Sequence, residues 1–362
     1  MGAMMRVIDG DGHVYEDGAA IAGCMPEPYN RYARLTGVFP PLDHFHTAFI
    51  DNGFIEEMMM RASVRRIGPD EWITFLEDTG IEFAVLYPTA GLACGKITDA
   101  YFANAAVRGY NDWLHDAYLR KSKRLKGMGL LPMCDIDGAV KEYRRVVKDL
   151  GMCGVMLPSN GLKAHPGSAD FWPIYAEAEK LGGCVAFHGG CHDHMGIDDL
   201  NVFAAYHALG HPLGMMRALV SMVYNGIFDR FPGLKVAYLE AGVAWFLTAL
   251  ERGEGSFKVH TPFDPEHRLI NVPKNGDFRA YVRKLIHDGR IFVGVEGDEP
   301  DLAHAVKTLG SEPFLFSSDF PHEVDAEICR HEIGEVMESH ELTETDKQGI
   351  LADNSRRFYN LN

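Results

Sequence analysis

The sequence lacks several features that would assign it to common classes of protein. No apolar run is long enough to span a bilayer, and the first residues lack the apolar core of a secretory signal. Basic residues are scarce, 35 against 51 acidic ones, and the net charge of −16 disfavours binding to nucleic acids or anionic membranes. The seven cysteines show no paired spacing of the zinc-finger or redox kind, as expected of free thiols in a reducing compartment. We therefore expect a cytoplasmic protein that binds neither nucleic acid nor membranes.

A glycine-rich phosphate loop is also missing, because the first apolar segment ends in Gly10-Asp11-Gly12-His13 rather than GxGxxG. This argues against a doubly wound nucleotide-binding sheet. What the chain does contain is eight short apolar segments, each followed by a helical pattern, and segments this continuously apolar are typical of strands buried on both faces. We predict one (β/α)8 TIM barrel domain over residues 1–362, with extra C-terminal helices. The predicted strands are 6–10, 81–87, 126–131, 153–157, 184–188, 235–240, 291–295 and 314–318.

Between the first strand and the regular alternation, residues 17–68 are rich in proline, glycine and aromatics and show no clear periodicity. A long segment of this kind is usually a functional loop, so we predict a lid-like insertion over the mouth of the site. It contains the pair His44 and His46, which we favour less as metal ligands, and the run Met58–Met60, which suits contact with an apolar substrate.

Polar side chains stand where four of the predicted strands end. The first strand is followed by Asp11 and His13, and three later strands end at His188, Glu240 and Asp319. A single one of these could be a core histidine or a helix cap, and Glu240 could cap the helix that we predict from residue 243. Because the carboxyl ends of barrel strands meet at one rim, the five residues together predict a divalent metal site.

Further histidines are candidates for substrate contact. His192 follows the fifth strand, and His322 lies three residues after Asp319, where it can orient that carboxylate or bind substrate. His211 is a third candidate. His207 and His211 are four residues apart, but Gly210 and Pro212 argue against a shared helical face, and we predict that the helix begins only at 212 and runs to 231.

Several motifs resemble the amidohydrolase superfamily, in particular its amidohydrolase-related branch that includes aminocarboxymuconate-semialdehyde decarboxylase. They are Ile8-Asp9-x-Asp11-x-His13, His188, the segment 229–242 that ends in Leu-Glu-Ala-Gly, Ser318-Asp-Phe-Pro-His322 and the segment 354–359. The resemblance implies a metal held by Asp11, His13, His188 and Asp319, with Asp319 also handling protons. Asp11 stands where the family usually has a histidine. The resemblance also implies a homodimer.

The decarboxylases of this branch usually carry a histidine where this chain has Glu240, and a carboxylate there would oppose a substrate carboxylate. We therefore predict a metal-dependent hydrolase of a small apolar acyl substrate (an ester, thioester, lactone or amide). Metal-activated water would attack, with Asp319 as acid and base and with His188 and Glu240 in the catalytic group. One alternative is a nonoxidative decarboxylase or hydratase, and another is a non-catalytic binding barrel. The oxygen-rich ligand set, Glu240 included, suits Zn²⁺ or Fe²⁺, and Mn²⁺ as well.

Overall fold

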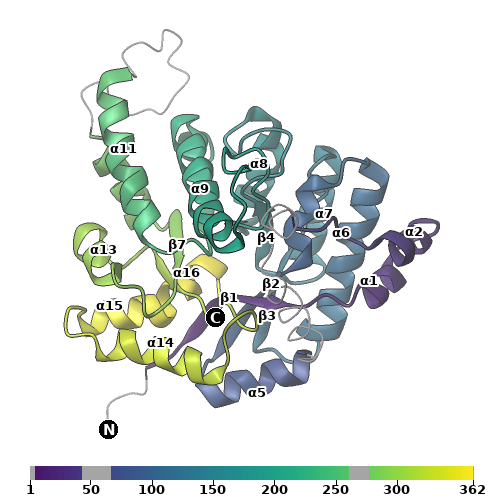
Figure 1. Ribbon diagram of the computed structural model, residues 1–362, viewed down its shortest axis with the longest axis horizontal. Helices are drawn as coiled ribbons and strands as arrows, with labels where there is room; N and C mark the ends of the chain where they lie inside the picture. The colour runs from purple at the N-terminus through teal and green to yellow at the C-terminus, as the bar shows by residue number, and fades with distance from the viewer. Residues whose placement is uncertain (1–4, 43–66, 261–276, 362) are drawn as a thin grey trace.

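The protein is described by a computed structural model that covers residues 5–42, 67–260 and 277–361 (Figure 1). The predictions for His44, His46 and Met58–Met60 lie outside the described residues. Within the described ranges, no helix combines the length and the apolar composition that crossing a bilayer requires.

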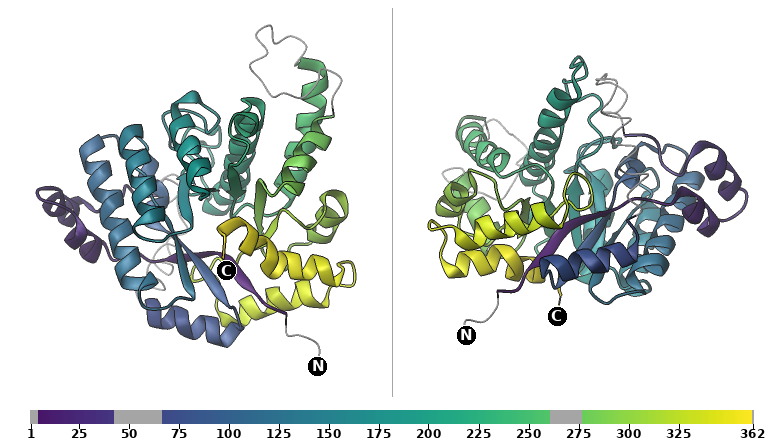
Figure 2. Two further views of the ribbon diagram at one scale, coloured as in Figure 1. Left: turned by 180° about the vertical axis from the view of Figure 1, so that it is seen from behind. Right: turned by 60° about the horizontal axis from the view of Figure 1, so that its bottom comes forward.

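Eight parallel strands form one sheet in the order of the chain, and helices surround it (Figures 1 and 2). The last strand meets the first through backbone hydrogen bonds, because the amide of Asp319 donates to Asp11 O at 2.9 Å and the amide of His13 donates to Phe320 O at 2.6 Å. These bonds close the barrel, and the predicted fold is confirmed. The strands are β1 Ile8–Val14, β2 Phe83–Pro88, β3 Leu125–Gly129, β4 Gly154–Pro158, β5 Cys184–His188, β6 Lys235–Tyr238, β7 Ile291–Val295 and β8 Phe314–Phe316.

Several helices on the outside of the barrel begin at an aspartate. Asp99, Asp135 and Asp277 each cap a helix by accepting a backbone N–H. The outer helices are α5 Pro69–Thr79, α6 Ala100–Leu114, α7 Ile136–Lys148, α8 Trp172–Leu181, α9 Phe203–Tyr224, α10 Ile227–Arg230, α11 Ala244–His260, α12 Phe278–His287, α13 Leu302–Leu309, α14 Ala326–Glu338, α15 Glu344–Gln348 and α16 Asn354–Tyr359.

The described part of the region after β1, residues 15–42, is less irregular than predicted. It contains the short helices α1 Gly18–Cys24 and α2 Tyr29–Thr36, and α1 packs against α6 at the outer edge of the molecule (Figure 1). Asp17 caps α1 by accepting the N–H groups of Ala19 and Ala20. Helices of one or two turns carry too little periodicity to be recognised in the sequence, and they form here because they pack on a neighbour.

One helix begins earlier than predicted, and another begins at an aspartate cap. Helix α9 starts at Phe203 and keeps Pro212 inside it, since a proline removes only one helical hydrogen bond and the buried Tyr206 and His211 hold this turn against the core. Helix α14 starts at Ala326, where Asp325 accepts the N–H groups of Glu327 and Ile328.

Candidate metal centre

Three of the predicted ligands meet at the carboxyl end of the barrel. Asp11 and His13 on β1 and His188 on β5 are all buried, and one ligand atom of each lies within 4.8 Å of the others. The Nε2 atoms of the two histidines are 3.2 Å apart. The carboxylate of Asp11 lies 3.6 Å from Nε2 of His13 and 3.5 Å from Nε2 of His188.

The partners of the histidines show which ring nitrogen faces this cluster. Nδ1 of His13 lies 2.8 Å from the carbonyl of Pro88, and Nδ1 of His188 lies 3.3 Å from the carbonyl of Gly189. A carbonyl only accepts, so each Nδ1 carries a hydrogen, and in a neutral ring the Nε2 atom presents a lone pair. Burial, together with the charges of His322 and His188, holds the pKa of His13 well below its usual value and keeps that ring neutral. Against the effect of burial, the carboxylates of Asp11 and Glu240 raise the pKa of His188 to about 9, so a cation bound here would displace the Nε2 proton of that ring.

With both rings neutral, two lone pairs and a carboxylate face one another, and they repel unless a cation lies between them. Oδ1 of Asp11 is buried and has no hydrogen-bond partner in the described part of the chain, which is costly for a polar atom. One divalent ion would satisfy all three groups, and each histidine already has the outer partner that usually fixes a metal-binding imidazole. The residues present therefore fit a metal.

The backbone under Asp11 and His13 is held from two sides. A Cβ on Gly12 would lie 2.3 Å from the Trp72 ring, so only glycine fits there, and Nε1 of Trp72 donates to the carbonyl of His13 at 3.1 Å. On the other side the buried carboxylate of Asp9 accepts three hydrogen bonds, from the amide of Asp11 at 3.1 Å and from the amide and hydroxyl of Ser318 at 3.0 and 2.7 Å. Asp9 thereby ties the metal-binding end of β1 to the chain after β8.

Asp319 reaches the same cluster from the last strand. Its Oδ1 lies 3.3 Å from Nε2 of His13 and 2.8 Å from Nδ1 of His322, whose Nε2 is 2.9 Å from the hydroxyl of Thr89. Burial raises the pKa of Asp319 to about 7, against the lowering effect of His322. A carboxyl group with such a pKa exchanges protons near neutral pH.

Glu240 lies on a different side of the cluster. It follows β6 in a left-handed conformation, with φ of 52°, and its Oε2 lies 3.2 Å from Nδ1 of His188 and 3.5 Å from Nε2 of His211. Nδ1 of His188 is the ring nitrogen that points away from Asp11 and His13. The carboxylate of Glu240 therefore faces imidazoles, outside the group formed by Asp11, His13 and His188.

The remaining candidate histidines fall into two places. The ring of His322 lies against that of His13, with centroids 4.3 Å apart and the planes tilted by 32°. His192 is fully buried with its ring 4.7 Å from that of His211. The expectation that His207 and His211 do not share a helical face is wrong, because both lie on α9 with ring centroids 4.6 Å apart.

Sequence reasoning did not assign roles to Asp9, Trp72 and Thr89. These residues form hydrogen bonds to Asp11, His13 and His322 and so fix their positions. Asp9 and Ser318 both stand inside the motifs that marked the family resemblance, and that was the available signal. Trp72 and Thr89 carried no signal, because their contacts with His13 and His322 join distant segments.

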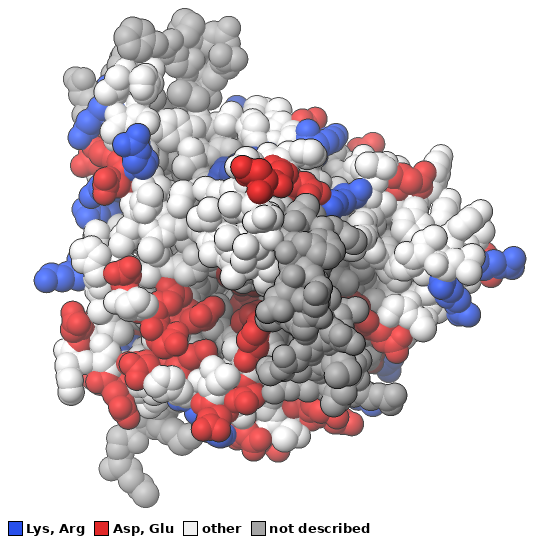
Figure 3. Space-filling view, in the orientation of Figure 1, with Lys and Arg blue, Asp and Glu red and all other residues white. Residues whose placement is uncertain are grey.

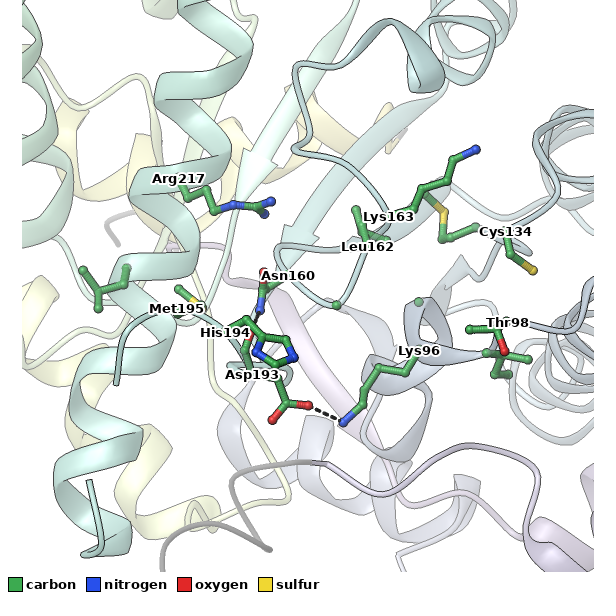
Figure 4. Close-up of a pocket in the computed structure, with 15 residues that line it drawn as sticks. Lys96, Thr98, Cys134, Asn160, Leu162, Lys163, Asp193, His194, Met195 and Arg217 are labelled. Atoms are coloured by element: carbon green, nitrogen blue, oxygen red, sulfur yellow. Dashed lines mark hydrogen bonds and ion pairs between the residues drawn. The ribbon is translucent and has the colours of Figure 1, made fainter. Parts of the chain in front are cut away.

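A cavity of about 860 Å³ opens beside the ends of β4 and β5 (Figure 4). Its wall includes Asn160, Lys96, Asp193 and Arg217, and Lys96 is paired with Asp193 at 2.8 Å. The guanidinium of Arg217 extends from α9 into the cavity (Figure 4) and donates to the carbonyl of Ser159 at 2.9 Å. In the described ranges no acidic side chain forms an ion pair with Arg217, so its charge is available to an anion.

Elsewhere on this face the surface is acidic. Figure 3 shows acidic side chains gathered over the region between β7 and α14. In the chain, the exposed acids between these two elements include Glu296, Asp298, Asp301 and Glu323. A negative surface of this kind attracts cations to the site, and an anionic substrate needs local positive charge to bind.

Comparison with known proteins agrees with this geometry. The model of the amidohydrolase family matches residues 8–361. The chain belongs to this family. The resemblance inferred from the motifs is thereby confirmed.

Several proteins similar to this amidohydrolase are decarboxylases by name. It is 27% identical over 252 residues to the 2-amino-3-carboxymuconate-6-semialdehyde decarboxylase of Dictyostelium discoideum, a match that covers 69% of this chain and 65% of the relative. It is 23% identical over 317 residues to a gamma-resorcylate decarboxylase from a Polaromonas species, covering 81% and 87%. Among solved structures, the 5-carboxyvanillate decarboxylase of Novosphingobium aromaticivorans superposes with a TM-score of 0.73 at 17% identity, covering 99% and 98%. That structure holds manganese and 3-methoxy-4-hydroxy-5-nitrobenzoic acid.

These comparisons contradict the predicted acyl hydrolase, because the named relatives are decarboxylases. The prediction is wrong, and the comparisons favour its alternative, nonoxidative decarboxylation. The argument for hydrolysis placed the charge of Glu240 against a substrate carboxylate. In the structure that charge faces His188 and His211 instead. Of the three metals predicted, the similar structure holds manganese.

Proposed function

We propose that this amidohydrolase is a nonoxidative decarboxylase that uses one divalent metal ion, Mn²⁺, and acts on a small aromatic or conjugated carboxylic acid. The observation that carries the proposal is the cluster of Asp11, His13 and His188, in which two Nε2 lone pairs 3.2 Å apart face a carboxylate oxygen that has no hydrogen-bond partner in the described residues. The activities and bound molecule named for the relatives support the substrate class.

In this proposal Asp11, His13 and His188 hold the ion, with Asp319 beside them. A cation bound there would supply positive charge for the substrate carboxylate. For Glu240 we propose a role other than ligand of this ion: its carboxylate lies 3.2 Å from Nδ1 of His188 and fixes the orientation of that ring through its charge.

Decarboxylation without an oxidant replaces a carboxylate by hydrogen, so the ring carbon must receive a proton. We assign this proton to the carboxyl group of Asp319, whose pKa burial raises to about 7. As the carbon–carboxylate bond breaks, its electron pair returns to the ring and carbon dioxide leaves. His322, 2.8 Å from Oδ1 of Asp319, holds the carboxyl group in place.

Arg217 supports an anionic or strongly polar group on the substrate. It is half-buried in the cavity wall, and bidentate binding of carboxylates is typical of a guanidinium. The cavity lies at the same end of the strands as the metal centre, because Pro158 at the end of β4 pairs with His188 and Asn160 follows directly.

The test is to load the full chain with Mn²⁺ and supply dihydroxybenzoates, carboxyvanillates and aminocarboxymuconate semialdehyde, with simple aryl esters as the hydrolase comparison. We expect carbon dioxide and the decarboxylated product from at least one acid. Asp319→Asn should lower kcat by about 10²- to 10⁴-fold, the usual contribution of a positioned acid. Asp298→Asn, an exposed acid after β7, is the matched control and should keep the normal rate.

Absence of carbon dioxide from every acid, with the metal bound and an ester hydrolysed, would overturn the proposal. A normal rate in Asp319→Asn would remove that residue from the proton transfer.

A further inference from the structure

We propose that this chain binds a second divalent cation, held by His207 and His211 on α9 and by Glu240 after β6. One ligand atom of each of these residues lies within 4.8 Å of the other two. Within this group Nε2 of His211 is 3.5 Å from Oε2 of Glu240, and the two imidazole rings are 4.6 Å apart. None of the three belongs to the group formed by Asp11, His13 and His188.

The spacing of the histidines is that of a metal site built on a helix. Residues four apart lie on one face of a helix about one turn from each other, and the H-E-x-x-H motif uses this pair of positions to bind zinc. A carboxylate from another element then completes a set of two nitrogens and one oxygen. Three protein ligands leave one position of a tetrahedral ion open, which is the arrangement of catalytic zinc sites.

The carboxylate supplies the second observation. Oε2 of Glu240 is buried and accepts no hydrogen bond from the described residues, although it lies between the rings of His188 and His211. Nδ1 of His211 lies 3.5 Å from the carbonyl of His207. Nε2 of His211 faces Oε2 of Glu240 at 3.5 Å. A cation bound between them would take both atoms as ligands.

The same three residues indicate how an ion reaches the second site and which ion fits it. His207 is exposed and His211 is buried, so the site reaches from the surface to the interior. Two imidazoles and one carboxylate are a ligand set that suits Zn²⁺. Glu240 also contacts Nδ1 of His188, so the second ion is linked to the first through one carboxylate and one imidazole ring.

The test counts bound metal and does not depend on the reaction. The full chain, dialysed against a chelator, is titrated with Zn²⁺ by isothermal calorimetry, and bound zinc is measured by elemental analysis. We expect two equivalents in the unmodified protein and one in His207→Ala, with the same loss in His207→Gln. His304→Ala, an exposed histidine on α13, is the matched control and should keep two. Circular dichroism checks that each variant folds. We expect the His207 variants to fold normally, because the side chain of His207 is exposed.

Asp11→Asn distinguishes the two sites. It should weaken zinc binding at the site of Asp11, His13 and His188 and leave zinc binding at the site of His207, His211 and Glu240 unchanged. A protein that binds one equivalent, or one that binds two and keeps both in His207→Ala, overturns the second site. Loss of decarboxylation in Asp11→Asn with one equivalent still bound would support both proposals. Failure to find any decarboxylation leaves the metal count as an independent result.

Discussion

Replacement of Ser318 by alanine tests how the barrel holds its metal-binding end. Asp9 is buried and accepts three hydrogen bonds, two of them from the amide and hydroxyl of Ser318. Ser318→Ala removes the hydroxyl donor at 2.7 Å and leaves the carboxylate with two donors. A hydrogen bond to a charged group contributes about 1.5–3 kcal/mol, so the free energy of unfolding should fall by about that amount. At about 2 °C per kcal/mol for a chain of this size, Tm should fall by about 3–6 °C.

The assay is thermal unfolding followed by circular dichroism, with urea unfolding as a second measurement, both at pH 8. Burial raises the pKa of Asp9 to about 6, and at pH 8 the carboxylate is therefore charged. Ser317→Ala is the matched control, because among the described residues the one hydrogen bond of its hydroxyl is a long contact of 3.4 Å with the carbonyl of Leu315. It should lose less than about 1 kcal/mol. Equal losses in the two variants would refute the reasoning about Asp9.

Three further outcomes are expected. His322→Gln removes the imidazole that pairs with Asp319, so kcat should fall by about 10- to 100-fold while the metal content stays the same. A loss of metal in proportion to the loss of activity would contradict this positioning role. Glu332 is buried with its pKa raised by burial and nearby acids from 4.5 to about 8, so its proton stabilises the fold below about pH 4.5 and this stability is lost as the pH rises to 8. The free energy of unfolding should therefore decrease over this window by as much as about 1.4 kcal/mol per pH unit, and Glu332→Gln should flatten the profile measured by urea unfolding. Arg217→Met should raise KM by about tenfold or more for a substrate with a second anionic group and change KM little for one without it, as steady-state kinetics would show.

Much of the barrel could be predicted because buried parallel strands are marked by short apolar runs. The candidate ligands Asp11, His13, His188 and Asp319 could be predicted from the strand ends, because the last residues of parallel barrel strands lie at one rim. The two-residue spacing of Asp11 and His13 also placed them on the same side of β1.

Other features depend on contacts between distant segments, which one sequence does not reveal. The side of His188 that Glu240 approaches is set by a left-handed residue after β6, and no pattern marks that conformation in a glutamate. The shared face of His207 and His211 was missed because Pro212 argued for a break that packing overrides. The chemistry was missed for a related reason: the effect of a carboxylate on a substrate depends on the direction it faces.

The central claim is that His13 and His188 bind one metal ion through their Nε2 atoms. The most direct measurement is electron spin-echo envelope modulation of the Mn²⁺-loaded protein that carries His207→Ala, so that only the barrel site contributes. The account predicts couplings from two histidine nitrogens, reduced to one in His13→Gln and in His188→Gln. A spectrum without nitrogen coupling, or one that neither substitution changes, would contradict the account.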